Sequence, residues 1–144
     1  MTAPDADLTI LHASTVAIAG RGLLILGASG AGKSALALSL IALGAMLVAD
    51  DRTIVTRRGA TLFATCPPAL TGMIEARGLG LLASPAAGET RLHLAVDLDR
   101  PETDRLPPRR SVSVLGLPLD LVLRSQGYHF PAAVLCYLKG GRTG

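Results

Sequence analysis

The stretch that decides the fold of this chain of 144 residues is Gly27-Ala28-Ser29-Gly30-Ala31-Gly32-Lys33-Ser34. The octapeptide matches the pattern GxxxxGK[ST] in full. It lies between a short apolar run at 23–26 and a series of strong helix formers at 33–43. Glycines allow successive backbone N–H groups to converge on phosphate oxygens, and the start of a helix adds positive partial charge. The pattern therefore predicts a buried strand, a phosphate-binding loop and a helix.

The residue types in this loop predict that the chain binds ATP together with Mg²⁺. The Lys33 ammonium is expected to reach the β- and γ-phosphates, and the Ser34 hydroxyl is expected to hold the metal ion. The residues expected to surround the nucleotide are all eight of the loop: Gly27, Ala28, Ser29, Gly30, Ala31, Gly32, Lys33 and Ser34. Nucleotide binding by itself does not decide what happens to the γ-phosphate.

The segments on either side of the loop predict a strand-rich α/β domain with few helices. Apolar, β-branched or alternating patterns favour strands at 8–11, 15–19, 23–26, 45–49, 53–57, 61–64, 72–76, 79–83, 91–98, 111–115 and 119–123. Helices are expected at 33–43, ended by Gly44, and at 131–139. We expect one P-loop kinase domain over residues 1–144, with 1–7 and 140–144 flexible.

Composition excludes several classes of protein. Hydrophobic residues make up 49% and charged residues 17%, which is typical of a chain with a packed core. The net charge of +3 comes with scattered arginines and few aromatic residues, so a nucleic-acid partner is not expected. The apolar runs are too short to cross a bilayer, and no signal peptide is recognised. The two cysteines are far apart and form no CxxC pair, which favours the cytoplasm over an oxidising compartment.

An acidic pair, Asp50-Asp51, ends the apolar segment at 45–49. Carboxylates at strand ends in such sheets lie at the ligand-binding edge. Adjacent residues of a strand point to different sides, so one carboxylate can face Mg²⁺ while the other faces an acceptor hydroxyl. The pair therefore predicts phosphoryl transfer, although a polar strand end without a function has the same composition.

These residues, taken with further segments, resemble the catalytic domain of the HPr kinase/phosphorylase family, which are bacterial P-loop protein kinases. The resemblance extends over residues 11–106 and is carried by five stretches: Leu11–Thr15, Gly27–Ser34, Leu47–Asp51, Ile74–Gly80 and, more weakly, Asp104–Leu106. The fourth stretch, IEARGLG, is similar to a family signature of the form E-x-R-G-x-G. It is far more specific than the phosphate loop.

The resemblance implies a set of catalytic residues. His12 would be the active-site histidine near the phosphates, and Asp51 would be the base that accepts the proton of the acceptor serine. Lys33 would polarise the phosphates. Arg77 belongs to the signature, and Arg105 would be an active-site arginine. General-base chemistry by a carboxylate beside the nucleophile agrees with these roles.

The resemblance also implies a metal site and a substrate. Ser34, Asp50 and Glu75 would hold Mg²⁺, Glu75 directly or through water. The implied reaction is ATP- and Mg²⁺-dependent phosphorylation of a serine of HPr, or of an HPr-like carrier protein of a phosphotransferase system. Two alternatives remain open: a nucleotide-binding switch that transfers no phosphate, and a small-molecule kinase.

Two departures from the family pattern limit what the resemblance implies. Family members usually carry an additional N-terminal domain, whereas almost nothing precedes Leu8 here, so we expect a short form. The family also has a Pro-Gly-Arg-Asn-like loop near its end, and the corresponding stretch here, Leu123–Tyr128, lacks that pattern. We therefore expect weak or absent phosphorylase activity. A homo-oligomer is possible, but the departure puts the family's hexamer in doubt.

Overall fold

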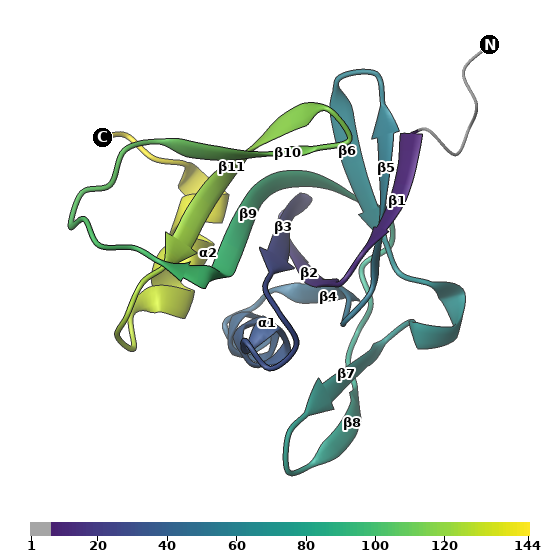
Figure 1. Cartoon of the computed structure of the whole chain (residues 1–144). Helices are drawn as coiled ribbons and strands as arrows, with labels where there is room; N and C mark the ends of the chain where they lie inside the picture. The colour runs from purple at the N-terminus through teal and green to yellow at the C-terminus, as the bar shows by residue number, and fades with distance from the viewer. Residues whose placement is uncertain (1–6) are drawn as a thin grey trace.

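The computed structural model describes residues 7–144 and is rich in strands, as expected (Figure 1). Its strands are β1 (Leu8–Leu11), β2 (Ala13–Ile18), β3 (Arg21–Leu26), β4 (Met46–Ala49), β5 (Thr53–Arg58), β6 (Thr61–Thr65), β7 (Met73–Ala76), β8 (Gly80–Ala83), β9 (Thr90–Pro101), β10 (Arg110–Val114) and β11 (Leu117–Arg124). The helices are α1 (Lys33–Ala42) and α2 (Phe130–Gly140), with a 3₁₀ turn, η2 (Pro68–Leu70). The expected flexibility of residues 1–6 concerns positions outside the described residues.

The strands form one large curled sheet and one separate hairpin. The path of the sheet is β1-β5-β6-β9-β3-β2-β4, with β11 added beside β9 and β10 beside β11. β3 runs parallel to β9, and β9 runs parallel to β11. Because β3 and β4 are both antiparallel to β2, they run parallel to each other. The expected βαβ-like unit β3-α1-β4 is therefore confirmed, with β2 inserted between its two strands.

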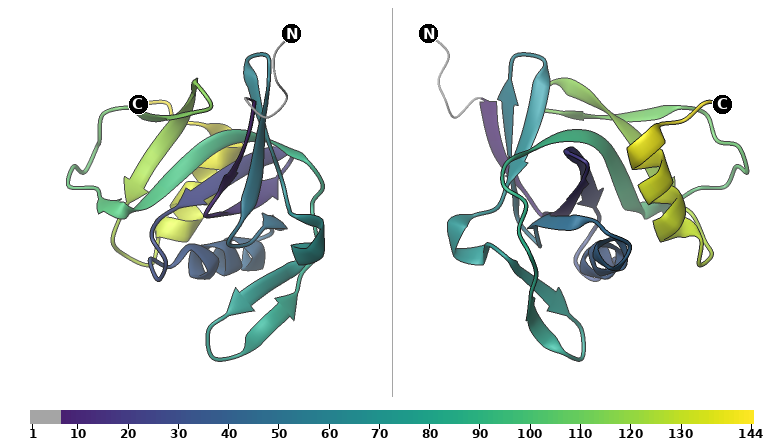
Figure 2. Two further views of the ribbon diagram at one scale, coloured as in Figure 1. Left: turned by 45° about the vertical axis from the view of Figure 1, so that its right-hand side comes forward. Right: turned by 180° about the vertical axis from the view of Figure 1, so that it is seen from behind.

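Apolar side chains from both faces of the sheet are buried in two clusters. On one face, Leu23 and Ile25 of β3 pack with Leu36 and Leu40 of α1 and with residues of α2. On the other face, Leu24 lies among residues of β5, β6, β10 and β11, inside the curl of the sheet. The three β3 residues have no exposed surface. Both helices cover the same face, as the view from behind shows (Figure 2).

Strand β9 departs from the pattern expected from its sequence. The alternation of apolar and polar residues predicts that Leu92, Leu94, Val96 and Leu98 share one face of a half-buried strand. In the structure Leu94, Val96 and Leu98 belong to the cluster beneath the helices, whereas Leu92 belongs to the cluster on the other face of the sheet. The pairing with β3 shifts register between Gly22 and Leu23, and such a shift turns a side chain to the other face. A Cβ at Gly22 would lie 2.8 Å from the Arg91 carbonyl oxygen, so only glycine permits this close approach.

The ends of α1 and of β9 are decided by local contacts. Gly44 has a φ of 113° and donates its N–H to the Ile41 carbonyl, which confirms its expected place after the helix. β9 continues to Pro101, three residues beyond its expected end. The loop that follows is closed by an ion pair between Glu102 and Arg110, with Nη2 3.0 Å from Oε2.

The β7–β8 hairpin projects from the body of the protein beside α1 (Figure 1). Ile74 of β7 is buried in the cluster between the helices and the sheet. At the outer end of the hairpin, Leu79 and Leu81 are 79% and 70% exposed. The hairpin is therefore anchored to the body at its base, through Ile74 of β7 and the partly buried Leu82 of β8, which packs against the same cluster.

The C-terminal residues 141–144 form no helix or strand. Arg142 nevertheless donates a hydrogen bond to the Pro107 carbonyl, and its own carbonyl accepts one from Arg109 at 3.1 Å. In residues 7–144 no helix is long and apolar enough to cross a membrane.

Candidate functional site

The phosphate loop connects β3 to α1, as its sequence predicts. Gly30 and Gly32 adopt left-handed φ values of 85° and 101°, which side chains with a Cβ rarely tolerate. Lys33 is 6% exposed, and its Nζ donates hydrogen bonds to the carbonyl oxygens of Gly27 at 2.7 Å and Ala28 at 3.0 Å. The ammonium group is therefore held against the loop that would surround the phosphates.

Asp99, just inside the C-terminal end of β9, contacts the same loop. Its two carboxylate oxygens accept the Ala28 N–H at 3.0 and 2.9 Å. Because β9 lies parallel to β3, the ends of both strands meet at one edge of the sheet. The contact ties the start of the loop to the neighbouring strand.

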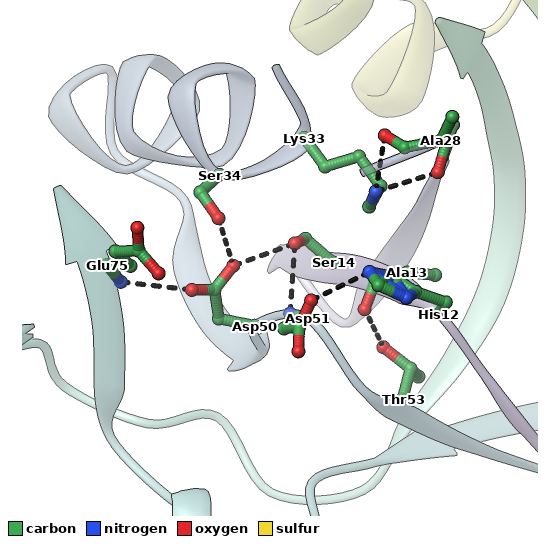
Figure 3. Close-up of polar contacts among 11 residues, drawn as sticks. His12, Ala13, Ser14, Ala28, Lys33, Ser34, Asp50, Asp51, Thr53 and Glu75 are labelled. Atoms are coloured by element: carbon green, nitrogen blue, oxygen red, sulfur yellow. Dashed lines mark hydrogen bonds and ion pairs between the residues drawn. The ribbon is translucent and has the colours of Figure 1, made fainter. Parts of the chain in front are cut away.

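Asp50 is the centre of the polar network at this edge (Figure 3). Its Oδ1 accepts hydrogen bonds from the hydroxyls of Ser34 at 2.6 Å and Ser14 at 2.8 Å. Its Oδ2 accepts the Glu75 backbone N–H at 3.0 Å. Asp50 is only 8% exposed, so these three donors compensate the cost of burying its charge. The network joins the start of α1, β2 and β7 to the end of β4.

The oxygen atoms in this network are suitable ligands for a magnesium ion. Mg²⁺ prefers oxygen ligands and usually keeps several waters, taking few ligands from the protein and the rest from substrate phosphates. The Ser34 hydroxyl donates a hydrogen bond to Asp50. The lone pairs of the Ser34 Oγ are therefore free to face a cation. Within residues 7–144 no cluster of three or more His, Cys, Asp or Glu side chains is arranged to hold a metal. A site made from Ser34, phosphate oxygens and water agrees with both observations.

Asp51 points to the opposite side from Asp50, as expected for two adjacent acids at a strand end (Figure 3). Its Oδ1 lies 2.8 Å from Nε2 of His12, and the two side chains are 59% and 55% exposed. The Asp51 N–H donates to the Ser14 hydroxyl at 3.2 Å. Asp51 has a φ of 68°, an unfavourable conformation that a short polar side chain tolerates better than most. The backbone thus aims this carboxylate at solvent beside the loop.

A cavity of about 530 Å³ brings most of the predicted site residues together. Its lining includes His12, Lys33, Ser34, Asp51, Glu75 and Arg77. They come from the β1–β2 link, the phosphate loop and α1, the segment after β4 and the β7–β8 hairpin. The cavity therefore has cations, carboxylates and a hydroxyl around one space.

Of the five predicted catalytic residues, Arg105 is the one that does not line this cavity; the predicted nucleotide and metal residues that do not line it are Gly27, Ala28, Ala31 and Asp50. Arg105 lies in the loop before β10 and lines a separate cavity of about 200 Å³ beside α2. Its catalytic role remains a prediction from the resemblance alone.

Sequence reasoning did not find Ser14 and Asp99, although both leave a signal. Ser14 is a fully buried hydroxyl in a strand of apolar neighbours, and such a group requires a hydrogen-bond partner. Asp99 lies near the carboxyl end of the long strand β9, where ligand-binding residues of parallel sheets gather. The hydrogen-bond partners of these two residues, Asp50 for Ser14 and Ala28 for Asp99, lie on segments that are distant in the sequence and meet only in the folded sheet.

A strand, a glycine-rich loop with lysine and serine, and a helix beside a strand-end aspartate define the chain as a P-loop protein. The model of the "HPr Serine kinase C-terminal domain" family matches residues 5–106. The chain belongs to this family. The HPr kinase/phosphorylase of Cupriavidus metallidurans is 43% identical over 130 residues, which cover 82% of this chain and 40% of that protein. That of Burkholderia lata is 44% identical over 124 residues, covering 78% and 38%.

A solved structure of the HPr(Ser) kinase/phosphatase from Coxiella burnetii has the same fold. The TM-score is 0.75 at 24% sequence identity, over 91% of this chain and 94% of that one. The expected strand-rich α/β kinase-domain fold is confirmed by this match. The chain spans about 40% of the length of the curated relatives it matches.

Proposed function

We propose that the chain transfers the γ-phosphate of ATP to a serine of HPr or an HPr-like carrier protein, with Mg²⁺. The observation that carries the proposal is the cavity shared by Lys33, Ser34, Asp51 and Arg77. Phosphoryl transfer needs positioning and charge stabilisation more than covalent chemistry from the protein. Cations on two sides of the cavity, with a carboxylate at its open edge, supply that arrangement.

In the proposed reaction the serine Oγ attacks the γ-phosphorus. A new O–P bond forms while the bond from the γ-phosphorus to the bridging oxygen breaks, and ADP leaves with the electron pair of that bond. Asp51 accepts the proton of the serine hydroxyl, and His12 orients the carboxylate through the 2.8 Å contact. Lys33 and Arg77 stabilise the negative charge that spreads over the phosphoryl oxygens.

Mg²⁺ would be held by Ser34 and would neutralise charge between the β- and γ-phosphates. Asp50 supports this site by accepting a hydrogen bond from the Ser34 hydroxyl. This hydrogen bond orients the lone pairs of the Ser34 Oγ. Oδ1 of Asp50 accepts two hydrogen bonds and Oδ2 accepts one, so Oδ2 keeps a lone-pair site for a direct or water-mediated contact with the metal. Glu75 lines the same cavity and is proposed to contact the metal, directly or through water.

The exposure of Asp51 supports a protein as the acceptor. With 59% of its side chain exposed, the carboxylate stands at the rim, where a serine on the surface of a folded protein has access. A base for a small-molecule acceptor is more often enclosed, because small substrates are buried when they bind.

We propose further that the reverse, phosphorylase reaction is weak. The segment Leu123–Tyr128 lacks the Pro-Gly-Arg-Asn-like pattern whose arginine the family uses near phosphoserine, and Arg124 is the basic residue in the segment that could replace it. Loss of one charge-assisted contact costs about 1.5–3 kcal/mol, roughly ten- to a hundredfold. Phosphorylated carrier supplied with phosphate should release pyrophosphate far more slowly than the forward reaction proceeds. Comparable rates in the two directions would refute this.

The forward reaction is tested by incubating the protein with γ-labelled ATP, Mg²⁺ and purified HPr. Label on an HPr serine, lost with Asp51→Asn, is the expected result. Hydrolysis of ATP without labelled HPr would favour the nucleotide switch instead. Label on a metabolite in a protein-free extract, with none on HPr, would favour the small-molecule kinase.

A further inference from the structure

A small cavity of about 70 Å³ lies at the end of the sheet opposite the phosphate loop. Its lining includes Arg21, the first residue of β3, whereas the loop follows the last residue of that strand. His93, near the start of β9, lines it as well, because Gly22 pairs with Leu92 in the parallel register of the two strands. The proposed phosphoryl transfer uses none of the groups in this cavity.

Positive side chains dominate the lining. Arg21, Arg109 and Arg142 contribute three guanidinium groups, and Asp120 of β11 contributes a carboxylate. Among the ion pairs formed within residues 7–144, none includes any of these three arginines. The cavity therefore has an excess of positive charge that no carboxylate in the described part of the chain pairs with.

Backbone contacts hold the arginine side chains in place. Arg21 Nε donates to the Leu138 carbonyl at 2.7 Å, and Arg109 Nη2 donates to the Arg142 carbonyl at 3.1 Å. Arg142 in turn donates to the Pro107 carbonyl. A guanidinium group has five N–H donors, so each of the three keeps donors for a further acceptor. Side chains that are already held in position lose less entropy when a ligand binds.

The end of α2 also lies beside this cavity, and its carbonyl groups have partners. The last carbonyls of a helix carry partial negative charge, which repels anions. The Tyr137 carbonyl accepts the Gly141 N–H at 2.8 Å, and the Leu138 carbonyl accepts the Arg21 contact. Capping of the helix therefore explains one N–H of Arg21, but it does not explain why two further arginines line the same space.

His93 responds to the charge in the cavity. Burial, together with the charges of Arg21 and Arg91, lowers the pKa of its imidazole. The titratable groups that line the two cavities beside the ring are Arg21, Arg91, Arg109, Asp120, Tyr137 and Arg142. An anion bound among them would oppose the effect of the arginines and favour the protonated ring.

The volume of the cavity selects a compact ligand. A water molecule takes about 30 Å³, so a space of about 70 Å³ holds roughly two waters or one ion of the size of phosphate. Guanidinium groups bind the oxygens of such ions through strong, charge-assisted hydrogen bonds. The Asp120 carboxylate can only accept hydrogen bonds, so it favours an oxyanion that still carries a hydroxyl. Hydrogen phosphate has that hydroxyl, and sulfate does not.

We propose that this cavity binds hydrogen phosphate, with Arg21, Arg109 and Arg142 on its oxygens and Asp120 accepting a hydrogen bond from its hydroxyl. The proposal is independent of the proposed kinase activity, because it uses neither the phosphate loop nor Asp51.

An NMR titration of the His93 ring with phosphate, at constant ionic strength, tests the proposal. Added phosphate should raise the pKa of His93 along a saturable curve, and sulfate should act more weakly. Sodium chloride at the same ionic strength is the control, because salt alone screens the arginine charges. An equal rise with chloride would show screening instead of binding and would overturn the proposal.

Substitutions in the lining identify the groups that hold the ion. Arg109→Gln and Arg142→Gln change side chains on irregular segments, so the fold should persist while phosphate binds about tenfold or more weakly. Arg100→Gln is the matched control, since Arg100 is exposed on β9 and lines neither this cavity nor the site cavity. Asp120→Asn should reduce the preference for phosphate over sulfate. Equal weakening by Arg100→Gln would mean that diffuse charge attracts the ion, and the proposal would be wrong.

Phosphate also suits the phosphate loop, and Lys33→Ala separates the two places. The His93 response should persist in Lys33→Ala. If the response disappears there, the ion binds at the loop and this proposal fails, while the kinase proposal stands. If HPr receives no label from ATP and the His93 response is intact, the proposed function fails and this site stands.

Discussion

Replacing Asp50 by alanine tests the network that holds the site together. The carboxylate accepts three hydrogen bonds, from Ser14, Ser34 and the Glu75 N–H. Asp50→Ala removes the acceptor from all three donors at once. It should therefore lower stability and separate the start of α1 from β7.

The magnitude follows from how exposed each donor is. Ser14 is fully buried, so its hydroxyl loses its partner with no water to replace it, at a cost of about 1–3 kcal/mol. Ser34 and Glu75 are more accessible, and water repairs much of their loss, which leaves about 0.5–1.5 kcal/mol each. Removal of a buried charge offsets part of the total. We expect a net loss of about 2–4 kcal/mol.

Urea denaturation and thermal unfolding followed by circular dichroism measure this loss. For a domain of this length about 2–4 kcal/mol corresponds to a fall of roughly 6–16 °C in Tm. Asp120→Ala is the matched control, because Asp120 is exposed on β11 and the same atoms are removed there. The reasoning is refuted if Asp50→Ala and Asp120→Ala unfold at the same temperature.

A double-mutant cycle measures how much of the lost stability comes from the hydrogen bond between Ser14 and Asp50. If Ser14→Ala and Asp50→Ala act through the same contact, their combined effect should be smaller than the sum of the two single effects by about 1 kcal/mol or more. Strict additivity would mean that the 2.8 Å contact between them contributes nothing to stability.

Three other perturbations have defined outcomes. Lys33→Ala removes the cation that is held by the Gly27 and Ala28 carbonyls, so calorimetry should show Mg-ATP affinity reduced about ten- to a hundredfold, and unchanged affinity would contradict the site. Asp51→Asn keeps a side chain that tolerates the φ of 68°, so ATP binding should persist while phosphoryl transfer to HPr falls roughly 10²–10⁴-fold in a single-turnover assay; loss of ATP binding instead would mean that the carboxylate holds the nucleotide. Burial, together with the neighbouring Arg21 and Arg91, lowers the pKa of His93 below its usual 6.5. As the pH falls, the unfolded chain therefore takes up this proton before the folded protein does. The free energy of unfolding should decrease from about pH 6.5 down to the lower pKa of the folded state. His93→Gln should flatten that decrease in urea titrations between about pH 7.5 and about pH 5.5, and an unchanged slope would show that another group causes it.

The local parts of this fold could be predicted from the sequence because they depend on neighbouring residues. The phosphate loop and α1 follow from glycine spacing and helix propensity, and the β5–β6 and β10–β11 hairpins follow from apolar runs interrupted by tight turns. The acidic pair was expected to face two sides, and Asp50 and Asp51 do so. Each of these features is decided within a few residues along the chain.

The family motifs extended the prediction to residues that local patterns do not connect. They placed His12, Glu75 and Arg77 in one site with Lys33, and the structure gathers all four around one cavity. For Arg105 the structure shows a different neighbourhood, beside α2. A short motif in a loop carries little information about position, because the loop's path depends on the contacts at both of its ends.

What only the tertiary structure decided is which strands lie together and which side chains meet across them. By itself the sequence determined a phosphate-binding loop, its helix and an acidic strand end. It did not determine that β9 pairs with β3, which brings Asp99 to Ala28, or that β2 separates β3 from β4, which brings Ser14 to Asp50. Pairings between distant segments are chosen by how the whole sheet buries both of its faces, and one shift of register at Gly22 changes the face of Leu92. That burial is a property of all the strands at once, so no local stretch of sequence encodes it.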